Sequence, residues 1–381
     1  MSAADATPAA SQPEAVPHPA RALDLDHIDY SPFDTALPAA EVKAFRDRAV
    51  AAGQANAARQ QLTTTPNRPM MIGLLVVFGL VFIATLVQLY IAVVSRGNVT
   101  PFTIGIPIFF AFLTLASALQ VYKEFGDKHW GNRARLPHFA VANGLEFRGL
   151  SAGPAYPGVI FRRGDSRTSI DRLTSTTGRY FDLGNFEYWT RTRTSRSVAR
   201  WGYLALRLDR KLPNMLLIAK KNQGLGGSDL PGTFHPDQVL SLEGDFDKYF
   251  TLYCPKQYEA DALYVFTPDL MALLIDEAYA FDVEIVDDWM FVVVRKPFSP
   301  FAATYERLFT IVRTVGAKTL SQTKNYHDAR AGAAGANTVA SEGRRLRRNI
   351  SAVRVLIMAV VLAIMLAIPI GLLILRQLYP D

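Results

Sequence analysis

Three long stretches of the chain are apolar all round. Residues 70–95, 101–122 and 355–375 contain no charged side chain, and each is long enough to cross the roughly 30 Å hydrocarbon core of a bilayer as a helix. A helix on the surface of a water-soluble core would show polar residues about every 3.6 positions, and these stretches do not. The pattern therefore predicts three transmembrane helices, at residues 70–95, 101–122 and 353–375.

The region between the second and third stretch follows a different pattern. Leu204, Leu206 and Leu208 alternate with other residues, as expected of a strand with one buried face. The same reading predicts strands at 145–148, 158–162, 180–190, 201–209, 214–220, 239–242 and 263–266, and a hairpin of 282–286 and 289–295 that turns at Asp287 and Asp288. Helices are predicted at 132–143, 268–280 and 301–315, the last of them ending at Gly316. The predicted fold class is an α+β cytoplasmic domain, an antiparallel meander plus two or three helices, attached to three transmembrane helices.

The remaining segments are polar or of biased composition. Residues 1–40 are rich in Ala and Pro and are expected to be a disordered tail, and residues 41–69 to be a juxtamembrane helix. No short apolar region follows a basic start within residues 1–69, so the first span is expected to act as its own insertion signal. The folded domain is expected to cover 132–316, followed by a polar linker, 317–352, that ends in a basic cluster.

Basic residues near the predicted spans indicate their orientation. The side of the membrane that holds the N-terminus and the central domain would carry Arg59, Arg68, Lys123, Lys128, Arg133, Arg135, Arg344, Arg345, Arg347, Arg348 and Arg354. The other side would carry only Arg96 and Arg376. By the positive-inside rule, we expect a multi-pass protein of the bacterial plasma membrane, with the N-terminus and central domain cytoplasmic and the C-terminus outside.

Overall composition excludes several classes of protein. The single cysteine, Cys254, cannot form a disulfide framework or a multi-cysteine metal site, and its sequence context indicates a buried thiol. The net charge of +7 is modest for 381 residues, so nucleic acid is not an expected partner. The six histidines are scattered without ligand spacing, and we expect no metal and no cofactor.

Two groups of arginines are candidate contacts for anionic lipid headgroups or another polyanion. Arg191, Arg193, Arg196 and Arg200 crowd a loop between two predicted strands, where a plain exposed loop is the alternative. Arg344, Arg345, Arg347 and Arg348 stand directly before the third span, where each basic residue near an anionic membrane surface contributes about 1 kcal/mol.

Carboxylates offer only weak catalytic candidates. Glu243 and Asp245 flank a glycine that permits an unusual backbone, so they are the first pair to test for acid–base chemistry. Asp282 and Glu284 fall on one face of a predicted strand, and their alternation indicates a solvated face.

Six short stretches resemble a family of uncharacterised bacterial membrane proteins. They are WGY at 201–203, LDRKLP at 208–213, LSLEGDF at 240–246, YCP at 253–255, DALY at 261–264 and VEIVDDW at 283–289. More distantly, residues 246–291 are similar to a domain of unknown function often paired with LemA-type membrane proteins. The likeness covers a little over a third of the chain. It implies membrane anchorage and an α/β cytoplasmic domain, and it brings no reaction or catalytic residue.

The sequence favours a membrane-anchored, non-catalytic protein that presents a cytoplasmic α+β interaction domain to an unidentified protein partner. Two alternatives stay open: a membrane-bound enzyme with an unrecognised carboxylate site, and an oligomeric transporter component. The spans hold no ionisable group at their centres, which argues against the transporter, while their alanines would allow a homo-oligomer to pack.

Overall fold

The computed structural model describes residues 22–59, 68–96, 100–125, 127–191, 196–224, 227–228, 230–331 and 337–349. These residues form two compact units. The first contains Ile28–Leu150 and Pro300–Ala302. The second contains Leu23–His27, Ser151–Ser299 and the described residues from Ala303 onward.

The first unit is helical. Its elements are η1 (Ser31–Phe33), α1 (Ala39–Arg59), α2 (Arg68–Ile91) with the π-helical turn η2 (Ala92–Arg96), α3 (Pro101–Phe125), α4 (Asp127–Ala134) and α5 (Leu136–Ala142), and strand β1 (Leu145–Ala152) begins in it. The helix predicted at 132–143 is split between α4 and α5, because Pro137 suits the first turn of a new helix. As predicted, that helix is followed by Gly144, whose positive φ of 67° suits a glycine.

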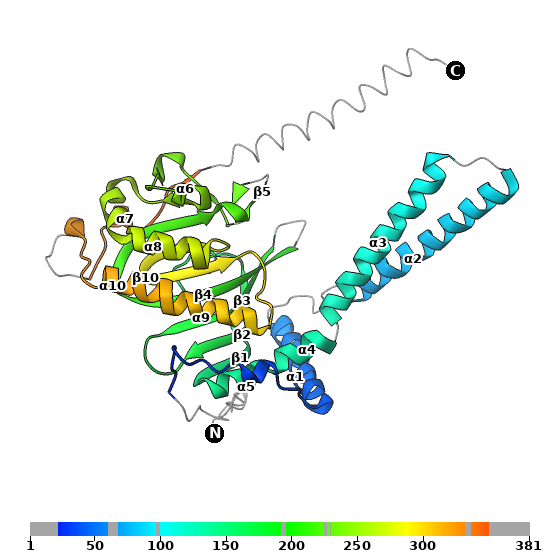
Figure 1. Ribbon diagram of the computed structural model, residues 1–381, viewed down its shortest axis with the longest axis horizontal. Coiled ribbons are helices and arrows are strands. Elements are labelled where there is room, and N and C mark those ends of the chain that lie inside the picture. Colours follow the sequence, from blue (N-terminus) through cyan, green and yellow to red (C-terminus); the bar gives the residue numbers. More distant parts are fainter. Residues whose placement is uncertain are drawn as a thin grey trace, which may run out of the picture. The chain divides into compact units, whose positions relative to one another are not determined.

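Helices α2 and α3 run side by side as a hairpin (Figure 1). Their segments Gly73–Val94 and Pro101–Leu119 are long and apolar enough to cross a membrane. Large apolar side chains such as Leu80 (62% exposed) and Phe112 (67% exposed) cover them, which is far more apolar surface than a soluble protein leaves in water. The first two predicted spans thus correspond to two helices of the required kind. The third, 353–375, lies outside the described residues.

The second unit is built on an antiparallel sheet of seven strands. Besides the end of β1 it contains β2 (Ser166–Ser175), β3 (Phe181–Arg191), β4 (Arg196–Ala219), β8 (Val239–Leu240), β9 (Phe250–Tyr253) and β10 (Asp282–Val294). The order is β1-β2-β3-β4-β9-β8, with β10 also paired to β4. Since β4 is 24 residues long, one of its edges binds β3 and then β9 while the other binds β10. The predicted α+β class with an antiparallel sheet is therefore confirmed.

Short elements and helices complete this unit. They are η3 (Lys220–Asn222), β5 (Gln223–Gly224), β6 (Gly227–Ser228), β7 (Thr233–Phe234), η4 (Pro236–Gln238), α6 (Phe246–Tyr249), η5 (Lys256–Tyr258), α7 (Glu259–Val265), α8 (Pro268–Leu273), η6 (Leu274–Ala278), α9 (Ala302–Ile311), η7 (Val312–Gly316), α10 (Ala317–Thr323), η8 (Ala329–Ala331), η9 (Ser341–Gly343) and β11 (Arg348–Asn349). Helix α9 lies across one face of the sheet (Figure 1). The centroids of the Phe309 and Phe181 rings are 5.6 Å apart. The core is aromatic, with Phe161, Phe186, Trp201, Tyr203 and Phe291 all at most 1% exposed.

Two predicted breaks are bulges in continuous strands. The segment 210–213 was expected to connect two strands, and Asp287 and Asp288 were expected to turn a hairpin. Instead β4 and β10 run on through both places, paired antiparallel, and the register shifts there: Asp287 is opposite Leu212, whereas Trp289 is opposite Arg207. The same residue types occur in hairpin turns and in bulges, because both need a residue outside the extended conformation. The sequence pattern therefore did not distinguish between them.

Other local predictions were wrong. Residues 158–162 form a turn rather than a strand, buried except at Arg162. Residues 263–265 belong to helix α7, and Phe266 is its C-cap. The helix predicted to end at Gly316 continues through α10 to Thr323. Gly316 itself is helical, and a Cβ there would lie 2.7 Å from Leu206 Cδ2, so the glycine permits close helix–sheet packing rather than a helix end.

The segment expected to be a polar linker was 317–352, and its described parts, 317–331 and 337–349, belong to the second unit. Asp328 accepts hydrogen bonds from the Tyr258 hydroxyl (2.7 Å) and from the Ala340 amide (2.9 Å). Leu346 is buried in the main apolar cluster, and β11 pairs with β7. The polar composition misled the prediction because a few anchors, rather than a periodic apolar face, hold this segment.

Candidate functional site

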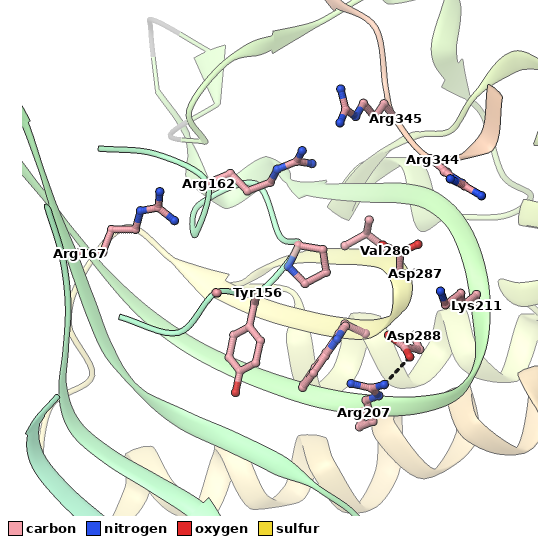
Figure 2. Close-up of a pocket in the computed structure, with 13 residues that line it drawn as sticks. Tyr156, Arg162, Arg167, Arg207, Lys211, Val286, Asp287, Asp288, Arg344 and Arg345 are labelled. Atoms are coloured by element: carbon pink, nitrogen blue, oxygen red, sulfur yellow. Dashed lines mark ion pairs between the residues drawn. The ribbon is translucent and has the colours of Figure 1, made fainter. Parts of the chain in front are cut away.

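The second unit holds an open cavity of about 650 Å³. Figure 2 shows its side chains arriving from four parts of the fold: the turn after β1, strand β2, the facing bulges of β4 and β10, and the segment before β11. The lining residues are Ala155, Tyr156, Pro157, Arg162, Arg167, Arg207, Lys211, Val286, Asp287, Asp288, Trp289, Arg344 and Arg345.

The bulges create this opening. Between their flanking pairs, β4 has the four residues 208–211 where β10 has only Asp288, so the ladder is interrupted beside the cavity. Asp287 adopts φ 51°, a conformation that costs a non-glycine residue about 1 kcal/mol or more. Strained bulges of this kind commonly lie beside functional sites, where they redirect side chains.

Positive charge dominates the lining. Five arginines and one lysine face two carboxylates, a formal excess of four positive charges. One carboxylate is already used, because Arg207 Nη2 lies 2.6 Å from Asp288 Oδ2. Within the described part of the chain, Arg162, Lys211 and Arg345 make no ion pair. The lining therefore carries a net positive charge.

Arg344 and Arg345 are held at the cavity by the strand that follows them. The Arg347 backbone is clamped by the Gln238 side chain, which accepts from its amide and donates to its carbonyl, both at 2.8 Å. The Arg347 guanidinium pairs with Asp237, and Arg344 Nε donates to the Val339 carbonyl at 2.8 Å. This anchoring reduces the conformational entropy that a flexible basic tail would lose on binding.

The aromatic side chains of the lining are already engaged. The Trp289 ring is stacked against Phe291 and lies 4.5 Å from the Tyr156 ring, and the Arg207 guanidinium lies 4.9 Å from its centre. Trp289 is only 8% exposed. Phe291, Tyr156 and Arg207 therefore occupy the surroundings of the Trp289 ring.

Glu284 is a buried carboxylate that interacts electrostatically with Arg162 of the lining. It was expected on a solvated face but is 5% exposed, and its Oε2 accepts a hydrogen bond of 2.6 Å from the Val159 amide. Burial raises the pKa of Glu284 to about 7, while the charges of Arg162 and Arg348 oppose that rise. Asp282, expected on the same face, is also buried and accepts from the Ala219 amide at 2.9 Å.

A closed polar cluster adjoins the cavity at Tyr156. We call Tyr156, Arg172, Tyr180, Asp182 and Tyr203 the Asp182 cluster. Asp182 is fully buried and accepts from Arg172 Nε (2.9 Å), from the Tyr156 hydroxyl (2.6 Å) and from the Tyr203 hydroxyl (3.1 Å). Burial and the negative charge of Asp182 hold the pKa values of Tyr156 and Tyr203 far above the ordinary tyrosine value. The charges of Arg172 and Asp182 neutralise each other, and the cluster has a structural role.

The two predicted arginine groups have different surroundings. Arg344 and Arg345 line the cavity, Arg347 pairs with Asp237, and Arg348 lies in β11, where burial and the charges of Arg163 and Arg162 lower its pKa. In the other group, Arg191 is exposed and Arg200 lies 3.4 Å from Glu187. Arg196 begins β4, and Arg193 lies outside the described residues.

The weak catalytic candidates do not meet at a cavity. Glu243 and Asp245 are exposed, are not among the residues that line the cavity, and Asp245 pairs with Lys248 at 2.7 Å. Gly244 between them does have the unusual backbone expected, with φ 71°. Cys254 is buried as predicted, and burial raises the pKa of its thiol to about 12. Within the described ranges, no group of three His, Cys, Asp or Glu residues could hold a metal ion.

Most of the cavity could not be found from the sequence. Arg162, Arg167, Arg207 and Lys211 belong to three separate elements, and no spacing along the chain links them to Arg344 and Arg345. The only signal was the density of basic residues before the third apolar stretch, which identified two of the six cations.

Comparisons with known proteins add little about function. No protein-family model and no curated protein matches the chain. Among solved structures, the mycobacterial trehalose monomycolate transport factor A, TtfA, is similar over 51% of this chain and 95% of that protein, with 14% identity and a TM-score of 0.36. So low a score carries no argument about function.

Proposed function

We propose that this is a membrane-anchored, non-catalytic protein whose α+β unit binds an anionic ligand in the cationic cavity. The observation that carries the proposal is the convergence on one open cavity of Arg162, Lys211 and Arg345, which make no ion pair among the described residues. Guanidinium groups offer paired donors to phosphate and carboxylate oxygens, so such a cavity is suited to binding.

Membrane anchorage is supported by the two exposed apolar helices and by the third apolar stretch in the sequence. We place the folded unit in the cytoplasm of a bacterial cell, as the distribution of basic residues indicates. The resemblance to a family of bacterial membrane proteins agrees with this arrangement. A protein partner and self-association stay predictions.

An enzyme is the second candidate, and Glu284 is the observation that favours it. A buried carboxylate with a pKa near 7 can exchange protons at neutral pH. Glu284 is not among the residues that line the cavity, however, so no substrate contact is apparent for it.

Titration of the full-length protein in neutral detergent with inorganic pyrophosphate tests the anion site, with tryptophan fluorescence as the readout. We expect saturable binding that weakens at least about tenfold in Arg162→Ala/Arg345→Ala, a loss of about 1.4 kcal/mol. The matched control is Lys296→Ala/Arg313→Ala, which removes two exposed positive charges outside the cavity. Equal loss in both variants would show nonspecific attraction, and absence of saturable binding would overturn the proposal.

A further inference from the structure

We propose that the anion bound in the cavity is the phosphate of a membrane lipid headgroup that ends in a phosphomonoester. This inference rests on the proposed anion binding and names its ligand. The chemistry shared with a soluble ligand is a doubly charged terminal phosphate, and the lipid is the source to which the structure points.

The charge of the lining favours a dianion. Six cations and two carboxylates leave an excess of four, and Asp288 neutralises only Arg207. A phosphodiester lipid brings one negative charge and two free oxygens. A phosphomonoester brings up to two charges and three oxygens, so more of the guanidinium donors can be used at once.

Two further arginines near the cavity, Arg163 and Arg348, also favour a doubly charged ligand. Burial, together with the positive charges of Arg163 and Arg162, lowers the pKa of Arg348, so these three arginines repel one another. The opposing Glu284 is buried and accepts from the backbone. Binding a dianion would relieve this repulsion, which gives a multiply charged phosphate an advantage over a monoanion.

The position of the cavity in the chain favours a lipid as the source. Arg345 precedes the third apolar stretch, which starts at residue 355, by ten residues. Ten residues span at most about 35 Å when fully extended. If that stretch inserts as its composition predicts, one wall of the cavity is tethered within that distance of the membrane surface, where headgroups are concentrated.

The packing of the aromatic rings in the lining also argues against a nucleotide as the ligand. Trp289 is packed against Phe291, Tyr156 and Arg207, so a nucleotide would gain no stacking on this ring. A compact phosphate presented at a lipid surface needs none.

The test uses short-chain lipids that stay soluble as monomers. Dihexanoyl phosphatidic acid, a phosphomonoester, and dihexanoyl phosphatidylglycerol, a phosphodiester with the same tails, are titrated into the full-length protein in neutral detergent. We expect phosphatidic acid to bind at least about tenfold more tightly. Arg162→Ala/Arg345→Ala should remove that preference, and Lys296→Ala/Arg313→Ala should keep it.

Further arms separate the outcomes. Arg345→Ala alone, which removes an exposed side chain that makes no ion pair among the described residues, replaces the double variant if the latter fails to fold. Equal affinity for the two lipids would overturn the inference. Pyrophosphate binding that phosphatidic acid does not displace would also overturn it, while leaving the anion site intact. Absence of binding by every anion would reject both proposals.

Discussion

The Asp182 cluster and the cationic cavity use the same residue types to opposite ends. In the cluster, Arg172 is 15% exposed and meets a fully buried aspartate at 2.8 Å, with tyrosine hydroxyls filling the remaining acceptor positions. In the cavity, Arg162 and Arg345 are exposed and make no ion pair in the part of the chain described. Tyr156 belongs to both regions, through its hydroxyl and its ring respectively.

This difference separates structural charge from charge that is open to a ligand. A buried ion pair must be satisfied within the protein, because the solvation it loses is not otherwise recovered. Exposed cations keep water as a partner and can exchange it for an anion. Three substitutions test this difference.

Asp182→Ala is expected to destabilise the protein by about 3–5 kcal/mol, since it leaves the Arg172 guanidinium buried without its partner. Urea unfolding of the full-length protein in neutral detergent, followed by tryptophan fluorescence, measures the loss. Asp209→Ala is the matched control, because Asp209 pairs with Arg179 at the surface (52% exposed) and should cost less than about 1 kcal/mol. Similar losses in the two variants would show that the buried cluster has no special structural weight.

Glu284→Gln is expected to stabilise the protein at pH 8 by up to about 3 kcal/mol and to change little at pH 5. Its folded-state pKa of about 7 exceeds the ordinary glutamate value of 4.5, so the folded state holds the proton more tightly than the unfolded state does. Wild-type stability should therefore fall as pH rises through this window and level off above about pH 7.

The same unfolding measurement at pH 5 and pH 8 checks this, with the exposed Glu243→Gln as the control. The opposite result would be a wild-type free energy of unfolding that rises from pH 5 to pH 8 and is matched by that of Glu284→Gln. It would mean that Glu284 is ionised in the folded protein and that the arginines fully compensate its charge.

Tyr156→Phe sharpens the boundary between the two regions and has the smallest expected effect. It keeps the ring against Trp289 but removes the hydroxyl that donates to Asp182, at a cost of about 2 kcal/mol. Urea unfolding measures the loss of stability, and titration with pyrophosphate measures the affinity of the same variant. Unchanged stability together with weakened anion binding would assign the hydroxyl to the ligand instead of to Asp182.

Local sequence patterns predicted the elements whose formation depends on residues close together in the chain. The apolar character of 73–94 and 101–119, the strand 181–191 and the helix start at Pro268 all follow from periodicity or from turn chemistry. The strand 166–175 was missed, because Ile170 and Leu173 are its only apolar residues and they do not alternate. Residues 263–265, at the end of α7, were assigned to a strand, because a short apolar run fits either period.

Composition and short-range spacing were enough to predict the apolar segments, the α+β class and the basic run at residues 344–348. They did not predict that Asp282 and Glu284 are buried, that Gly316 lies inside a continuing helix, or that Arg344 and Arg345 reach a cavity beside two bulges. Burial and charge compensation depend on which distant residues become neighbours in the fold, and spacing along the chain does not contain that information.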